Sequence, residues 1–187
     1  MKKGIMILLF TFLTIISFSQ EFIGIKVDGK INDVIEKFKG KGLKVTSSSS
    51  TPNVISMEGI VGNRNLELNI VCSPTTKIVW KFAVYLPKQT LWTSLKSEYE
   101  EYLDLLTKKY GEPEKTYNFF SSPYKEGDGY EMTAVAVEKC TYSAFWPENL
   151  GLYIGISQWK QVKITYENIT NSALAKKEQD EIKNKIF

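Results

Sequence analysis

The stretch WTSLKSEYEEYLDLLTKKYGEP at residues 92–113 carries the strongest periodic pattern in the chain. Its apolar and aromatic residues recur at intervals of three and four, which places them on one face of a helix. They are Trp92, Leu95, Tyr99, Tyr102, Leu103, Leu106 and Tyr110. Gly111 and Pro113 follow, as is typical of a helix end. The pattern therefore predicts a helix that buries one face and ends at Gly111.

Strand-like segments and a charged tail follow this helix. Runs of alternating or apolar residues predict four strands, at 115–120, 132–146 (broken near Lys139), 150–158 and 162–166. Residues 172–187 are highly charged and carry only a sparse apolar stripe. We expect a C-terminal helix there that lies loosely on the domain or frays.

The part of the chain before residue 92 repeats this order. Residues 31–38 place apolar side chains at i, i+3, i+4 and i+7, and Gly40 and Gly42 end the predicted helix. One strand is expected before this helix, at 22–27. Further strands are expected after it, at 43–45, 54–58, 65–71 and 78–86.

These patterns predict an α+β fold made of two tandem helix-then-antiparallel-sheet units. Unit one spans residues 20–87, unit two spans 88–169, and a C-terminal helical tail covers 170–187. The segment between the units is short and does not resemble a linker between separate domains. We therefore expect one compact domain over 20–187, with both helices on one face of the sheet.

Residues 1–19 have the pattern of a cleavable signal peptide. Lys2 and Lys3 precede an uncharged, mostly apolar run of 15 residues, and small side chains stand at Ser17 and Ser19. The alternative is an uncleaved N-terminal anchor, but a spanning helix needs roughly 20 apolar residues. The pattern predicts an exported protein, periplasmic or secreted, with no integral membrane segment after signal cleavage.

The composition excludes several function classes. The chain contains no histidine, so it cannot build a Ser-His-Asp triad or a histidine-ligated metal site by itself. Removal of the signal leaves 22 basic against 21 acidic residues, and Arg64 is the single arginine. A nearly neutral chain with one arginine is not expected to bind nucleic acid.

The acidic loop EGDGYE at 126–131 could collect oxygen ligands for a cation, but it lacks the spacing of a calcium loop. We interpret it as a solvated turn. The sequence therefore predicts no metal site and no cofactor.

Two cysteines, Cys72 and Cys140, remain after signal cleavage. An exported compartment permits a disulfide between them. Each cysteine is also in phase with the apolar residues of its predicted strand, as a buried free thiol would be. The spacing leaves both alternatives open.

The segment FIGIKVDG at 22–29, with FKGKGL at 38–43, resembles the opening of a family of exported proteins from Gram-negative bacteria. The helix end LTKKYGEP at 106–113 and the late strand VKITYE at 162–167 are similar to segments of the same family. No activity is assigned to that family, so the resemblance implies no catalytic residue. More distantly, the tandem helix-then-sheet order is similar to β-lactamase inhibitor proteins and small outer-membrane assembly lipoproteins. That likeness is one of architecture, and a fold does not imply a function.

The aromatic residues give the candidate binding site. Strand alternation places Tyr85, Tyr153 and Trp159 on the faces opposite the main apolar rows. If the sheet face away from the helices is open, they form an aromatic surface of the kind that anchors interfaces. The loop from Ser121 through Tyr124 to Tyr130 could flank this surface. The alternative is that this face is covered by the C-terminal segment or by another subunit.

Three hypotheses for function follow from these observations. The first is a non-enzymatic binding module that holds a protein or peptide on a sheet face. The second is a structural or accessory cell-envelope protein, which an unpaired edge strand would favour through β-augmentation. The third, and the least favoured, is a carboxylate-based hydrolase, which would need two carboxylates about 5–9 Å apart in a deep cleft.

Overall fold

The computed structural model describes residues 20–46 and 51–185, and the predicted signal peptide at 1–19 lies outside this range. Unit one contains β1 (Glu21–Phe22), β2 (Ile25–Lys26), α1 (Ile31–Lys39), β3 (Lys44–Val45), β4 (Val54–Val61), β5 (Arg64–Cys72) and β6 (Val79–Tyr85). Unit two contains α2 (Trp92–Tyr110), β7 (Lys115–Phe120), α3 (Glu131–Ala136), β8 (Cys140–Phe145), η1 (Glu148–Leu150), β9 (Leu152–Ser157) and β10 (Gln161–Glu167). The C-terminal helix α4 covers Ile169–Asn184.

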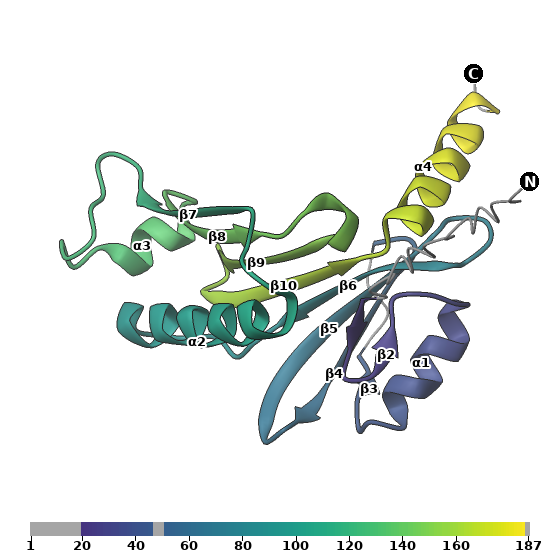
Figure 1. The fold of residues 1–187 in the computed structure, drawn as a ribbon, viewed down its shortest axis with the longest axis horizontal. Coiled ribbons are helices and arrows are strands. Elements are labelled where there is room, and N and C mark those ends of the chain that lie inside the picture. Colours follow the sequence, from purple (N-terminus) through teal and green to yellow (C-terminus); the bar gives the residue numbers. More distant parts are fainter. Residues whose placement is uncertain (1–19, 47–50, 186–187) are drawn as a thin grey trace, which may run out of the picture.

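One antiparallel sheet runs through both units (Figure 1). Its strand order is β3-β4-β5-β6-β10-β9-β8-β7, while β1 and β2 form a separate two-stranded sheet. Each unit contributes a meander of consecutive strands, and the last strands of the two meanders, β6 and β10, pair antiparallel from Lys81–Glu167 to Tyr85–Lys163. The first strands of the meanders, β3 and β7, therefore form the two edges of the sheet.

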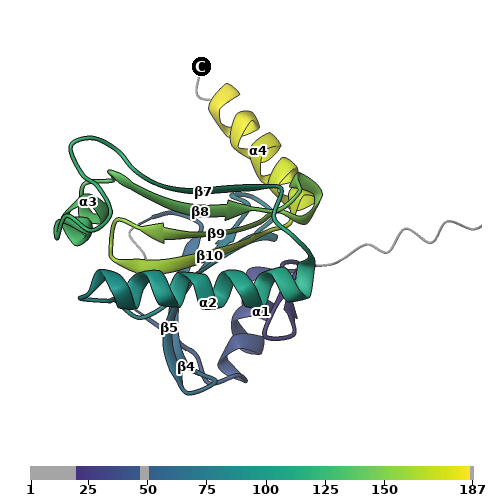
Figure 2. The same cartoon turned by 60° about the vertical axis from the view of Figure 1, so that its left-hand side comes forward.

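Helices α1 and α2 pack on the same face of this sheet (Figure 2). The ring of Phe38 in α1 lies 5.1 Å from that of Phe82 in β6, and Tyr99 in α2 lies 5.8 Å from Tyr142 in β8. Strand register places Phe82 and Tyr142 on one side, where Phe38 and Phe82 are fully buried. The predicted α+β class, with tandem helix-then-sheet units and a C-terminal helix, is confirmed.

Three of the predicted strands were wrong in their bounds. The strand predicted at 54–58 extends to Val61 as β4. Residues 22–27 form the hairpin of β1 and β2 rather than one strand, because Ile23 and Gly24 both adopt positive φ angles that turn the chain back. Residues 131–136 form the short helix α3, so the predicted strand at 132–146 begins only at Cys140. A short apolar run does not distinguish a buried helix from a strand by its period. Ala134 and Val135 are both buried in α3, as adjacent residues of a packed helix can be.

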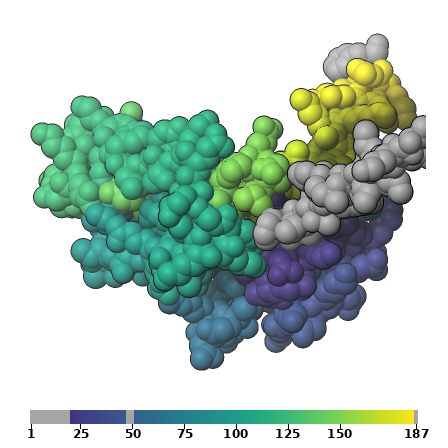
Figure 3. All heavy atoms as spheres, in the orientation of Figure 1, coloured from purple at the N-terminus to yellow at the C-terminus, as the bar shows by residue number. Residues whose placement is uncertain are grey.

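Helix α4 is anchored to the β5–β6 hairpin as far as Glu178, so the expectation of a loosely packed tail was wrong for this part of the helix. The Glu178 carboxylate, which is buried, accepts hydrogen bonds from the Thr75 and Thr76 amides at 2.7 and 3.1 Å and from the Thr76 hydroxyl. Asn168 caps the helix by accepting from the Asn171 amide. In the space-filling view, the rest of α4 stands out from the body of the protein (Figure 3).

We predict that Glu178→Gln loosens α4 while the rest of the fold persists. Burial by itself raises the pKa of Glu178, but the hydrogen bonds from Thr76 and Thr75 outweigh burial and lower the pKa below its ordinary value. The charged carboxylate therefore stabilises the docked helix at neutral pH, and this contribution is lost as pH falls below about 4.5. The substitution should cost about 2 kcal/mol in the free energy of unfolding. It should also raise hydrogen exchange in α4.

The exposed Glu181, on the same helix, gives the matched control Glu181→Gln, which should leave both quantities unchanged. Equal hydrogen exchange in α4 of the wild type and Glu178→Gln would contradict this account of how α4 is held.

Cys72 and Cys140 are both free and buried, so the disulfide alternative is not realised. The two residues lie on β5 and β8, which are separated in the sheet by β6, β10 and β9. Four strand spacings amount to about 19 Å, whereas bonded cysteines have Cα atoms within about 7 Å. Burial raises the pKa of both thiols, that of Cys140 to about 12.

We expect the purified protein to carry two thiols that react only after unfolding. Alkylation in guanidinium without a reductant should modify Cys72 and Cys140 in nearly every molecule, as read by mass spectrometry. Alkylation of the native protein should modify few molecules. A denatured protein that resists alkylation until it is reduced would show that a disulfide exists.

Candidate functional site

The sheet face turned away from α1 and α2, here called the open face, is solvent-accessible over unit two. Tyr117 in β7 is 43% exposed and Phe145 in β8 is 39% exposed, although both are large aromatic residues. By register, the side chains of Tyr153 in β9, Lys163 in β10 and Tyr85 in β6 point to the same side of the sheet. The open face therefore presents aromatic and charged groups on a rigid surface of paired strands.

Three rings form an aromatic row across β7, β8 and β9. The centroids of Tyr117 and Phe145 lie 6.1 Å apart with the rings nearly perpendicular, and those of Phe145 and Tyr153 lie 4.8 Å apart. Phe145 and Tyr153 are directly opposite in register, and Tyr117 is diagonal to Phe145 because it pairs with Ser143. Such cross-strand aromatic pairs stabilise a sheet while one side of each ring remains available for contact.

Tyr153 lies along its own strand, over Gly155. A Cβ atom at position 155 would meet the Tyr153 hydroxyl and lie 2.7 Å from Cζ of the ring, so only glycine leaves room for the tyrosine. Gly155 pairs with Ser143 on one side and with Lys163 on the other. The phenol therefore ends between these two positions, at the middle of the open face.

Tyr85, Tyr153 and Trp159 line one hollow of about 350 Å³. Lys163 lies between them, and its Nζ atom is 5.7 Å from the centre of the Tyr85 ring. Burial raises the pKa of Tyr85 and of Tyr153, so both phenols are neutral hydrogen-bond donors near pH 7. Trp159, in the turn after β9, is 60% exposed. The structure thus brings together three of the five predicted binding residues.

A second hollow, of about 820 Å³, continues this surface toward the start of α4. The aromatic row lines one side of it, and Lys81 and Glu167 line another. These two side chains form an ion pair at 3.5 Å, and both are partly exposed. Tyr153 and Lys163 border both hollows, so the open face of unit two is one continuous candidate surface.

Tyr124 and Tyr130 do not line either hollow. Tyr124 is half-buried and packs against the hydrophobic core. Tyr130 precedes α3 and is 63% exposed, with its amide hydrogen-bonded to Asp128. The loop that was expected to flank the site therefore packs Tyr124 against the edge of the core and places Tyr130 beside α3.

Sequence reasoning missed Tyr117, Phe145 and Lys163. All three lie within predicted strands, and alternation alone would have placed each opposite the core-facing residues of its strand. Tyr117 and Phe145 reach Tyr153 through the register of β7, β8 and β9. The proximity of Lys163 to Tyr85 could not be predicted, because it depends on the pairing of β6 with β10.

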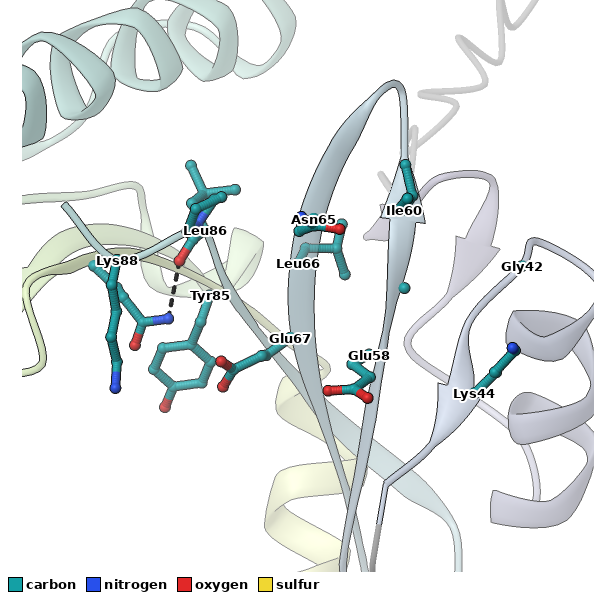
Figure 4. Close-up of a pocket in the computed structure, with 13 residues that line it drawn as sticks. Gly42, Lys44, Glu58, Ile60, Asn65, Leu66, Glu67, Tyr85, Leu86 and Lys88 are labelled. Atoms are coloured by element: carbon teal, nitrogen blue, oxygen red, sulfur yellow. Dashed lines mark hydrogen bonds between the residues drawn. The ribbon is translucent and has the colours of Figure 1, made fainter.

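A third hollow, of about 470 Å³, lies mainly on unit one, between β3, β5 and the end of β6, and is also lined by Lys88 and Gln161 of unit two (Figure 4). Glu58 and Glu67 are directly opposite in register on β4 and β5 and line this hollow with Tyr85. Both glutamates are exposed and lie on adjacent strands of one hairpin. Glycosidase chemistry requires two carboxylates that flank a bound sugar, one of them in an environment that keeps it protonated. This arrangement does not provide such an environment.

The carboxylates of the acidic loop 126–131 are used in hydrogen bonds and an ion pair. Glu126 pairs with Lys96 at 2.6 Å and accepts from the Tyr142 hydroxyl, and the hydrogen bond from Lys96 is the main reason its pKa is lowered. Asp128 accepts from the amides of Lys125 and Tyr130. Across residues 20–46 and 51–185, no group of three or more acidic or cysteine residues is arranged to hold a metal ion. Within the same range, no helix is long and apolar enough to cross a membrane.

Comparisons of the chain with protein-family models, with curated proteins and with solved structures found no match. The resemblance to exported bacterial proteins and the architectural likeness to β-lactamase inhibitor proteins therefore stay predictions.

We predict that Gly155→Ala displaces Tyr153 and destabilises the protein mainly through that clash. Forcing a methyl group into a packed position costs about 1–3 kcal/mol. In the background of Tyr153→Ala the same substitution should cost less, because the ring is gone and only the Tyr142 carbonyl, 3.2 Å from the added Cβ, remains close. A double-mutant cycle of chemical unfolding measures this coupling. Additive effects of the two substitutions would contradict the packing of Tyr153 over Gly155.

Proposed function

We propose that this protein is an exported, non-enzymatic binding module that holds a protein or peptide on the open face of unit two. The observation that carries the proposal is the surface formed by Tyr85, Tyr153 and Trp159 with the aromatic row. Aromatic side chains supply large contact areas at low cost in conformational entropy, and they dominate the binding energy of many interfaces.

The rigidity of the surface supports the same function. Tyr153 is held between Phe145 and Gly155, so a ligand would not have to order its ring on binding. The Lys81–Glu167 pair and Lys163 add charged groups around the rings. Aromatic anchors with a polar surround are the usual composition of a protein-binding site.

The size of the surface favours a short segment of the partner. The strands from β6 to β7 span four spacings, about 19 Å, and six residues along a strand span about 20 Å. An extended peptide of about six residues, or a loop of a folded protein, would cover this area.

The test is capture of a partner from a detergent extract of the source cell envelope, read by mass spectrometry. The baits are the purified protein, the double variant Tyr153→Ala/Trp159→Ala and the control Tyr130→Ala. Tyr130 is a suitable control because its exposure, 63%, is close to the 60% of Trp159, yet it lines neither hollow. We expect a partner that the wild type and Tyr130→Ala capture alike. The double variant should capture at least tenfold less of it, since truncation of each of the two anchor residues costs about 1 kcal/mol or more and about 1.4 kcal/mol is tenfold.

A partner retained by the double variant would contradict the choice of the open face. Failure of the wild type to capture any protein or peptide would contradict the proposed function itself.

A further inference from the structure

Strand β7 forms an unprotected edge of the sheet. Within residues 20–46 and 51–185 its six residues pair only with β8, and all of them except Phe120 are exposed. The opposite edge is the two-residue strand β3, which offers little backbone to a partner. An exposed edge of this length presents a row of backbone donors and acceptors that another strand can use.

The usual devices that block an edge strand do not occur within β7. It contains no proline, and its register with β8 runs without a bulge from Lys115 to Phe120. Its one charged residue, Lys115, stands at its end, and its exposed aromatic residues are Tyr117 and Phe119. An edge with these properties is expected to associate with another strand.

The hydrogen-bond pattern of β7 determines which residues face outward. The Ser121 amide donates to the carbonyl of Lys139 at 2.8 Å, so odd-numbered residues in this stretch direct their backbone groups toward β8. The even-numbered residues Thr116, Asn118 and Phe120 therefore direct theirs away from the sheet.

We propose that two copies of this chain associate through β7, antiparallel and with the two-fold axis at Asn118. In this register Asn118 pairs with Asn118 of the second copy, and Thr116 pairs with Phe120 in both directions. All three outward-facing residues of each strand are then hydrogen-bonded. A register shifted to centre on Tyr117 would use only Thr116 and Asn118 of each strand, so the pairing at Asn118 satisfies the most backbone groups.

The side chains fit the same register. Tyr117 lies opposite Phe119 of the second copy at a position without backbone hydrogen bonds, where side chains across an antiparallel pair come closest. Both rings are on the open face, so the aromatic rows of the two copies would meet at the interface. The two Lys115 residues lie at opposite ends of the paired strands. The register therefore places no two like charges opposite each other.

The self-complementarity of β7 favours a second copy over an unrelated strand. A two-fold axis pairs the same surface on both subunits and closes the assembly at a dimer. The resulting sheet of sixteen strands would end at β3 in both copies, where the edge is short. This association uses the outward backbone groups of β7 and needs no partner on the open face, although Tyr117 belongs both to β7 and to the lining of the larger hollow.

Disulfide trapping tests the register. Tyr117→Cys and Phe119→Cys are prepared separately, and each is oxidised alone and as a mixture of the two. The mixture should give a disulfide-linked heterodimer in several-fold excess over the linked species that either variant forms alone. In the proposed register, residue 117 and its own counterpart are diagonal, about 7–8 Å apart, beyond the usual range for a disulfide. Cys72 and Cys140 are buried and should not compete. The register would be overturned if disulfide-linked dimers formed when each variant was oxidised by itself but not in excess in the mixture.

Sedimentation analysis tests the association itself. The wild type and Asn118→Thr, which keeps the backbone amide, should be dimers, whereas Asn118→Pro lacks the central outward amide and should be a monomer. Circular dichroism is used to check that Asn118→Pro is folded. If this variant does not fold, the disulfide-trapping experiment still tests the association. The variant Tyr153→Ala/Trp159→Ala should also be a dimer, which separates this proposal from the proposed function. A monomeric wild type, or a dimeric Asn118→Pro, would overturn the proposal.

Discussion

The antiparallel pairing of β6 with β10 is the interaction on which the rest of the structure depends. Each meander alone would be a four-stranded sheet with two edges, preceded by α1 in unit one and by α2 in unit two. Their union through five paired positions produces a single sheet that places α1 and α2 on one side. The same union brings Tyr85 of unit one beside Lys163 and Tyr153 of unit two, so the candidate site exists only when both units are joined.

The asymmetry between the two sheet faces accounts for the character of the site. On one face, α1 and α2 cover a core that contains Phe38, Phe82 and Tyr99. On the other, large aromatic residues remain partly exposed and pack mainly against one another. An exposed surface of this composition lowers the solubility of a protein. Proteins usually carry such a surface where they bind another molecule.

The sequence predicted the local structure well and the long-range structure less completely. The helix at 92–110 and the strand at 115–120 were recognisable because each has one clear period and a glycine or proline at its border. The helix over Glu131–Ala136 was missed because a short apolar run fits either period. The anchoring of α4 was not predicted because it depends on one carboxylate. Glu178 accepts a hydrogen bond from the amide of Thr75, in a turn about a hundred residues earlier in the chain. Of the site, alternation predicted the side on which Tyr85 and Tyr153 lie, but only the pairing of β6 with β10 places them together.

Photo-crosslinking in living cells would test most directly that the open face is a binding surface. A photoreactive amino acid at position 159, which lines the smaller hollow from the turn after β9, is compared with the same residue at position 130, which has similar exposure elsewhere. The account predicts a discrete crosslinked adduct from position 159 and none from position 130. An adduct from position 130 alone, or none from position 159, would contradict it.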